Sequence, residues 1–155
     1  MVEVGDSPKL PPTVAIDDTM LTLLSSEWFD GVSGNVLRTY PGEHMTVNDL
    51  SKLEYKDSIS ISILDPSVPS YLAIRFFDYG EDEVPDQIVD EIDCITDTDR
   101  CNGSHSETGF QFSIHVPETP VVIVVDIMYS ILDPGVSPGH LSNTVSWGAV
   151  LGYFT

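Results

Sequence analysis

Basic residues are scarce in this chain. Only six lysines and arginines stand against 25 aspartates and glutamates among 155 residues, which gives a formal net charge of −19. A surface of this charge repels DNA, RNA and anionic lipid, so the composition argues against a nucleic-acid partner. The shortage of lysine extends along the whole chain, which contains only Lys9, Lys52 and Lys56. Acidity spread in this way indicates adaptation to high salt, where repulsion between charges is screened within a few ångströms. A cation-rich partner or bound Ca²⁺ is the alternative explanation of the charge.

Long apolar runs are missing too. The longest, Val121–Val125, is followed at once by Asp126, whereas a membrane-spanning helix needs ~20 apolar residues in succession. Residues 1–12 have neither the basic start nor the apolar stretch of a secretory signal peptide. We therefore expect no membrane span and no export signal.

Recognisable catalytic motifs are absent as well. The chain has no glycine-rich phosphate loop, no metal-binding box and no nucleophile elbow, and its four histidines are scattered. The sequence therefore favours a non-enzymatic protein. A small glycoside hydrolase is the enzymatic alternative, because 25 acidic residues bring some carboxylate pair within catalytic distance by chance.

The chain does contain a clear two-residue period. Segment 56–64 alternates Ile59, Ile61 and Ile63 with serines, which is typical of a half-buried antiparallel strand. Proline and glycine turns separate such segments, and no strand–helix–strand alternation appears. We predict an all-β fold, a two-sheet antiparallel sandwich of jelly-roll or immunoglobulin-like type. The other segments with strand patterns are 32–40, 43–47, 71–77, 110–116, 120–132 and 143–155.

The domain organisation follows from composition. Residues 1–15 hold three of the 11 prolines and predict an extended N-terminal arm. Residues 16–155 then form a single sandwich domain. Within it, residues 78–109 read as an acidic insertion loop, because ten of the 25 acids fall in residues 78–101.

One short N-terminal helix is predicted over residues 16–31. Asp17 or Asp18 can cap its start, and Gly31 can end it. The apolar residues with helical spacing are Met20, Leu21, Leu24 and Trp28. A strand and turn is the alternative, since serine and threonine are frequent in this segment.

A short motif occurs twice. SILDPSVPSY at 62–71 resembles SILDPGVSPG at 130–139, and each copy runs from an alternating segment into Asp-Pro. Asp65-Pro66 and Asp133-Pro134 fit the first two positions of a type I turn, in which the aspartate caps the turn amides. Internal duplication or independent use of the same turn chemistry explains the repeat, and either origin concerns the scaffold.

The acidic segment contains a candidate calcium site, which makes calcium the one candidate cofactor. Asp93, Asp97 and Asp99 can converge on Ca²⁺, which takes about six to eight oxygens. Arg100 and Cys101, however, occupy places where a calcium loop has small or polar residues. A solvated acidic loop without metal is therefore the alternative.

The two cysteines favour a disulfide. Cys94 and Cys101 enclose six residues, and a bridge here closes a tight loop. Two free thiols are the alternative, whereas a zinc site with His105 lacks a fourth ligand. Asn102 begins an Asn-Gly-Ser glycosylation sequon. Bridge and sequon together indicate a location outside the cell.

Apolar residues near both ends predict contacts between subunits. Those of the arm gain little free energy unless a neighbouring surface covers them, and the last strand has no polar tail. The predicted assembly residues are Val2, Val4, Leu10, Trp147, Tyr153 and Phe154.

These features predict a structural protein of an extracellular assembly. A virion component of a virus that infects a halophilic host fits best, as a capsid decoration or turret, a minor capsid protein or a tail protein. Virion proteins are made in the cytosol without an export signal, and their thiols oxidise after release. The expected partners are further copies of the chain and other virion proteins. The alternative is a receptor- or carbohydrate-binding surface module, assisted by calcium.

Overall fold

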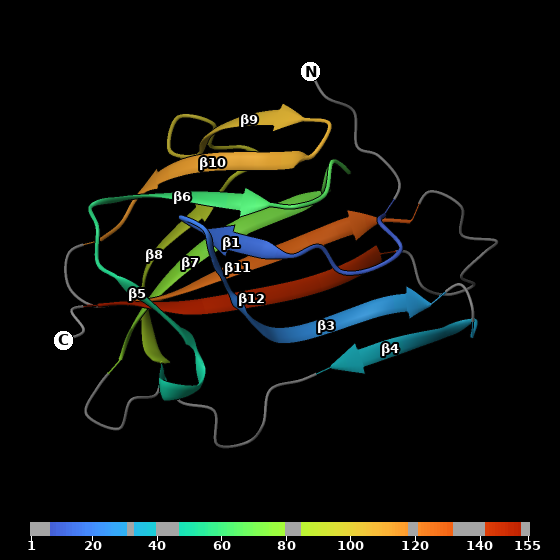
Figure 1. The fold of residues 1–155 in the computed structure, drawn as a ribbon, viewed down its shortest axis with the longest axis horizontal. Helices are drawn as coiled ribbons and strands as arrows, with labels where there is room; N and C mark the ends of the chain where they lie inside the picture. Colours follow the sequence, from blue (N-terminus) through green and yellow to red (C-terminus); the bar gives the residue numbers. More distant parts are fainter. Residues whose placement is uncertain are drawn as a thin grey trace.

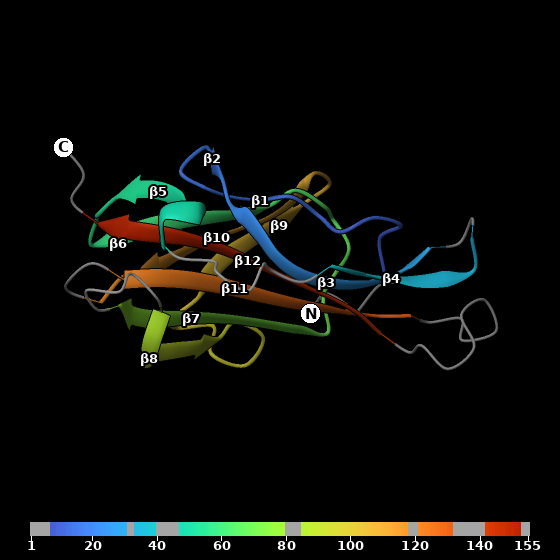
Figure 2. The ribbon, with the colours of Figure 1, turned by 90° about the horizontal axis from the view of Figure 1, so that it is seen from below.

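The all-β sandwich is confirmed. A computed structural model describes residues 7–30, 33–39, 47–79, 85–117, 121–131 and 142–152. Two sheets pack face to face, and neighbouring strands are antiparallel except for one pair (Figure 1; Figure 2).

The smaller sheet has five strands in the order β2-β1-β6-β10-β9. Its edges are therefore the two-residue strand β2 and the strand β9. The strands are β1 (Val14–Ile16), β2 (Thr19–Met20), β6 (Ser58–Ile63), β9 (Asn102–Ser106) and β10 (Gly109–His115).

The larger sheet has seven strands, six of them in the order β4-β3-β12-β11-β7-β8. Strand β5 lies parallel to the last residues of β12, beyond the point where β3 stops pairing with that strand. A 3-10 turn, η1 (Val47–Asp49), precedes β5. The strands are β3 (Thr22–Asp30), β4 (Asn35–Thr39), β5 (Ser51–Glu54), β7 (Tyr71–Tyr79), β8 (Pro85–Asp93), β11 (Val121–Ser130) and β12 (Ser142–Gly152).

The core lies between the sheets and follows from the alternation in the sequence. The three isoleucines of β6 are buried, with exposed fractions of 3% or less, while the serines between them face outward. Phe76 of β7 and Ile123 of β11 meet them from the larger sheet and are fully buried. Burial of each such side chain contributes roughly 1.5–3 kcal/mol, so this period is enough to direct one face of each sheet inward.

The predicted N-terminal helix is wrong. Residues 14–20 form the hairpin β1–β2, and β3 pairs with β12 over residues 22–27. Asp17 and Asp18 have φ of 45° and 75°, as in a two-residue hairpin turn with both central residues left-handed. Asp17 accepts a hydrogen bond from the Ser60 amide instead of capping a helix. The serines and threonines of this segment suit a strand, and pairing with β12 outweighs the weak helical spacing.

The described part of the predicted arm lies against its own domain. Val14 and Ala15 belong to β1 and pair with β6. The Pro8 carbonyl accepts a hydrogen bond from the Trp28 indole at 3.1 Å, and Asn143 donates to the Ser7 hydroxyl at 2.8 Å. The first six residues, with Val2 and Val4, lie outside the described residues.

The first copy of the repeated motif forms the expected capped turn. The Asp65 carboxylate accepts the Ser67 amide at 2.8 Å, just after β6. The second copy follows β11, but Asp133 and Pro134 lie outside the described residues. Because β6 and β11 belong to different sheets, the repeat marks the end of one strand in each sheet.

Tyr129 places a polar hydroxyl group in the apolar core. Its exposed fraction is 0%, and its ring packs edge-on against Trp28 with centroids 5.9 Å apart. Its hydroxyl has no hydrogen-bond partner among the described residues. Burial, with a smaller contribution from the nearby Asp65 carboxylate, raises the pKa of Tyr129.

We expect Tyr129→Phe to stabilise the protein by about 1 kcal/mol, because it removes a buried hydroxyl without a partner. Because the folded-state pKa is raised, the neutral form stabilises the fold below about pH 10, and this stability is lost as the pH rises further. The wild type should therefore lose stability above about pH 10, and the variant should lose less. Urea unfolding at neutral and alkaline pH measures both effects.

Tyr71→Phe is the matched control, since the Tyr71 hydroxyl accepts a hydrogen bond from Arg75 at 2.8 Å. That variant should be slightly destabilised at neutral pH. A loss of stability in Tyr129→Phe as large as in the control would contradict the assignment of an unsatisfied hydroxyl.

Candidate functional site

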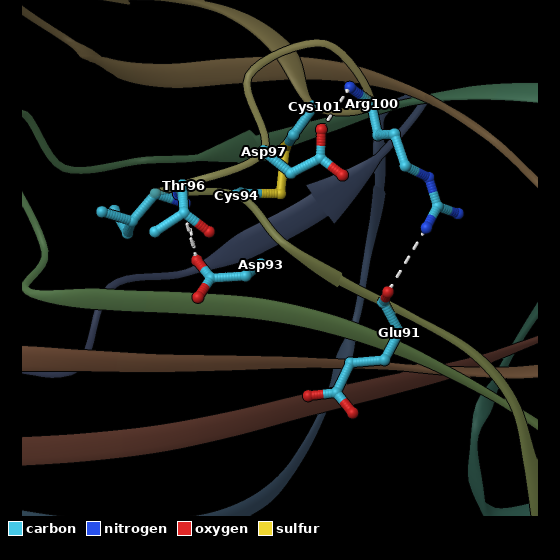
Figure 3. Close-up of a disulfide and its surroundings, with 8 residues drawn as sticks. Glu91, Asp93, Cys94, Thr96, Asp97, Arg100 and Cys101 are labelled. Atoms are coloured by element: carbon cyan, nitrogen blue, oxygen red, sulfur yellow. Dashed lines mark hydrogen bonds between the residues drawn. A yellow bond between two sulfur atoms is a disulfide. The ribbon is translucent and has the colours of Figure 1, made fainter.

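The acidic segment is built around a disulfide. Cys94 and Cys101 are bonded, with Cα atoms 5.2 Å apart, and both residues are buried (Figure 3). The bridge lies between β8, an edge strand of the larger sheet, and β9, an edge strand of the smaller one. Segment 78–109, expected as an insertion loop, therefore contributes one strand to each sheet, and the disulfide closes the turn between them.

The aspartates of this turn cap backbone amides. Asp93 accepts hydrogen bonds from the Ile95 and Thr96 amides at 3.0 and 3.2 Å. Asp97 accepts the Arg100 amide at 3.2 Å (Figure 3). These bonds explain why the acids occur at this spacing, since each carboxylate fixes the residues that follow it.

The structure does not bring the predicted calcium ligands together. Among the described residues, no three histidine, cysteine or acidic side chains form a group that could hold a metal ion. This applies to Asp93, Asp97 and Asp99, and to His105 as a zinc ligand. The His105 ring instead stacks on Phe110 at 4.1 Å and lies 2.7 Å from the Pro66 carbonyl.

Arg100 folds back over the acidic strand β8. Its guanidinium contacts the Asp90 carboxylate and lies 3.4 Å from the Glu91 carbonyl oxygen. The hydrogen bond to Asp90 raises the pKa of Arg100, more than partial burial lowers it. The pair is solvent-accessible, so its stabilisation is at most about 1 kcal/mol. Its effect is to neutralise one acid beside the disulfide.

Asn102, the predicted glycosylation residue, is the first residue of β9 and is exposed. Its neighbour Gly103 has no room for a side chain, because a Cβ there would lie 2.3 Å from the Phe112 ring. The asparagine is therefore accessible, and its glycosylation stays a prediction.

The outer face of the smaller sheet is largely polar, and its strands β6, β9 and β10 contain no acid, lysine or arginine. We call it the hydroxyl face. Gln111 donates a hydrogen bond to Ser60 at 2.9 Å across its centre. Two hollows of about 130 and 200 Å³ lie beside β9, smaller than the roughly 300–1,000 Å³ of small-molecule sites. The face comprises Ser58, Ser60, Ser62, Ser104, Gln111 and Ser113.

The larger sheet carries apolar residues on its outer face as well as towards the core. We call this second group the outer apolar cluster. In β11 the odd-numbered residues 121–125 pack in the core, while Val122 and Val124 belong to the outer cluster. Its buried members are Leu50, Val122 and Val150, and its half-buried members are Leu24, Phe77, Tyr79 and Val124. Sequence reasoning noted the apolar run of β11 but not what lies beside it.

A compact ion-pair network borders this cluster. Arg75 contacts the Asp126 carboxylate, lies 3.4 Å from Glu91 and donates to the Tyr71 hydroxyl. Ser146 donates a hydrogen bond to Asp126 on the other side. These side chains come from β7, β8, β11 and β12, so the charges at the centre of this face are paired with one another.

The predicted assembly residues fall into three groups. Leu10 exposes 75% of its surface, so it is open to a neighbour. Trp147 is half-buried and packs against the core of its own sandwich. Tyr153 and Phe154 lie outside the described residues, as do Val2 and Val4.

Comparison with protein-family models, with curated proteins and with solved structures gave no match. Among the described residues, no helix is long and apolar enough to cross a membrane.

Removal of the bridge should destabilise the fold. In the chain-entropy model, Cys94→Ser with Cys101→Ser lowers the free energy of unfolding by roughly 2–3 kcal/mol, because the unfolded chain gains the freedom of the opened loop. Chemical denaturation of the oxidised wild type and the double variant measures this difference. Wild type treated with reductant is the control and should match the variant; equal midpoints for all three samples would show that the bridge does not constrain the chain.

Proposed function

We propose that the chain is a non-enzymatic structural subunit of an extracellular assembly. Its concrete form is a virion component of a virus that infects a halophilic host: a capsid decoration or turret, a minor capsid protein or a tail protein. The observation that carries the proposal is the outer apolar cluster on the larger sheet.

A single sandwich needs only one apolar face on each of its sheets. Each sheet requires one apolar face to form the core, and the outer face of an antiparallel sheet is usually polar. Here Phe77, Tyr79 and Val124 remain half-buried on that outer face, around a buried centre of three residues. In a chain of net charge −19, the half-buried apolar side chains of this cluster support a role as a contact to a neighbouring subunit.

The charge supports the environment that we propose. At −19, two copies repel each other in dilute buffer, and molar salt shortens the Debye length to ~3 Å. An apolar contact then tightens as salt increases, whereas a contact made of ion pairs weakens. The disulfide supports assembly or release into an oxidising medium.

The hydroxyl face favours a second function. Serine hydroxyls and the Gln111 amide can exchange hydrogen bonds with a carbohydrate or a receptor surface without a charge penalty. A surface-binding module is therefore the alternative proposal. If this binding module is assisted by calcium, added calcium should raise the melting temperature of the protein.

Val124→Glu tests the contact. Light scattering should give a mass above 17.0 kDa for the wild type in molar NaCl and a lower average mass for the variant. Val124 is half-buried on the outer face, and circular dichroism checks that the variant keeps the fold. Leu64→Glu is the control, because Leu64 is equally apolar, 51% exposed and outside the cluster. Equal masses for the two variants would remove the outer apolar cluster from the proposal.

Salt should also stabilise the folded monomer. Ten of the 25 acids lie in residues 78–101, and screening relieves the repulsion among them. We expect the melting temperature to rise steadily from 0.01 M to molar NaCl. Measurement at low protein concentration separates this effect from association, and a flat profile would contradict a halophilic origin.

A further inference from the structure

Strand β9 is an open edge of the smaller sheet. Among the described residues it pairs only with β10, and all five of its residues are exposed. In Figure 1 it forms the upper border of that sheet, with no strand beyond it. One side of its backbone is therefore available for hydrogen bonds with another strand.

β9 differs from the other edge strands in charge. Natural proteins usually protect an open edge with charged residues or by making it very short. Strand β8 contains four acids, β4 contains Arg38, and β2 has only two residues. The sequence of β9, NGSHS, has no charged residue when its histidine is neutral. It is the unprotected edge among those that the structure describes.

The strand is also held in place before any partner binds. The disulfide anchors the residue that precedes it, since Cys101 is bonded to Cys94. Near its other end, His105 stacks on Phe110 and lies 2.7 Å from the Pro66 carbonyl. A partner strand therefore meets a preformed edge, and little conformational entropy is lost on binding.

From these observations we infer that β9 pairs with β9 of a second copy of this chain, antiparallel and about a twofold axis, so that two five-stranded sheets join into one. A second copy of the chain is a suitable partner for this edge. Two strongly acidic chains repel each other least where the surfaces in contact carry no charge. Maximal overlap places Ser104 opposite Ser104. The outward side chains of Asn102, Ser104 and Ser106 then form a continuous hydroxyl and amide ladder across the junction.

The inference rests on the proposed assembly role but uses a different surface from the outer apolar cluster. It also bears on the sequon, because a glycan on Asn102 would occupy this edge. Glycosylation and pairing therefore exclude each other, and the test uses oxidised, unglycosylated protein.

Ser104→Cys tests the contact and its register. Cβ atoms of directly opposed residues lie about 4.5–5.5 Å apart, close enough for a disulfide after a small adjustment. Both native cysteines are already bonded, so the new thiol is the only free one. In molar NaCl with a mild oxidant, we expect a covalent dimer of twice 17.0 kDa on a non-reducing gel. Ser58→Cys, on β6 and two strands from the edge, should remain largely monomeric.

Ser104→Glu gives an independent readout without new covalent chemistry. A charge on each side of the axis should weaken the dimer at least tenfold, whereas Ser58→Glu adds the same charge to the same face and should leave the dissociation constant unchanged within about twofold. Equal cross-linking of the two cysteine variants, or equal dissociation constants of the two glutamate variants, overturns the inference.

Repeating the cross-linking in the Val124→Glu background separates the two proposals. Persistence of the Ser104→Cys dimer there supports edge pairing even if the outer apolar cluster proves irrelevant. Loss of the dimer in that background overturns pairing as an independent contact. A wild type that stays monomeric at every salt concentration, together with no Ser104→Cys dimer, overturns both proposals.

Discussion

The rest of the structure depends on the pairing of β11 with β7 and β12. This ladder runs for ten residues along β12 and seven along β7, and it places β11 at the centre of the larger sheet. Because Val121–Val125 is apolar at every position, it supplies both the core and the centre of the outer apolar cluster. One strand thus links the stability of the monomer to the surface through which we propose that it assembles.

The high negative charge is the second constraint on the structure. It affects where the charged residues lie more than how many of them there are. All three arginines pair with acids: Arg38 with Glu27 at the β3–β4 edge, Arg75 on the larger sheet and Arg100 beside the disulfide. Arg75 and Arg100 neutralise carboxylates next to the surfaces that we propose as contacts. Among the described residues no acid is buried, so solvent and salt can screen the remaining carboxylates.

The disulfide connects the two sheets at their edges. It fixes the acidic turn, whose aspartates cap their own amides, and it anchors the start of β9. The capping bonds give the acidic residues of the turn a structural role, and the edge strand beside it is preformed. The disulfide thus links the stability of the fold to the edge through which we propose that two copies pair.

How far the sequence could predict the candidate surfaces differs between them. The serines of the hydroxyl face were visible in segment 56–64, because they alternate with isoleucines that had to face the core. The outer apolar cluster was not predicted, because it joins Leu24, Leu50, Phe77 and Val150 from strands and a turn far apart in the chain. The predicted calcium ligands share one turn, where one oxygen each of Asp93 and Asp97 accepts backbone amides, a role that the spacing of the acids did not reveal.

By itself, the sequence determined the sandwich class and the strands that alternate strictly, and it favoured the bridge between two closely spaced cysteines over two free thiols. In these cases the physical cause is local: side-chain direction along a strand, or the reach of a short loop. Only the tertiary structure decided that residues 14–30 form the strands β1, β2 and β3 in place of the predicted helix, because pairing with β6 and β12 outweighs a weak helical period. The tertiary structure also decided that residues 102–106, NGSHS, form the strand β9. Their composition does not favour a strand, but pairing with β10 supplies the backbone hydrogen bonds.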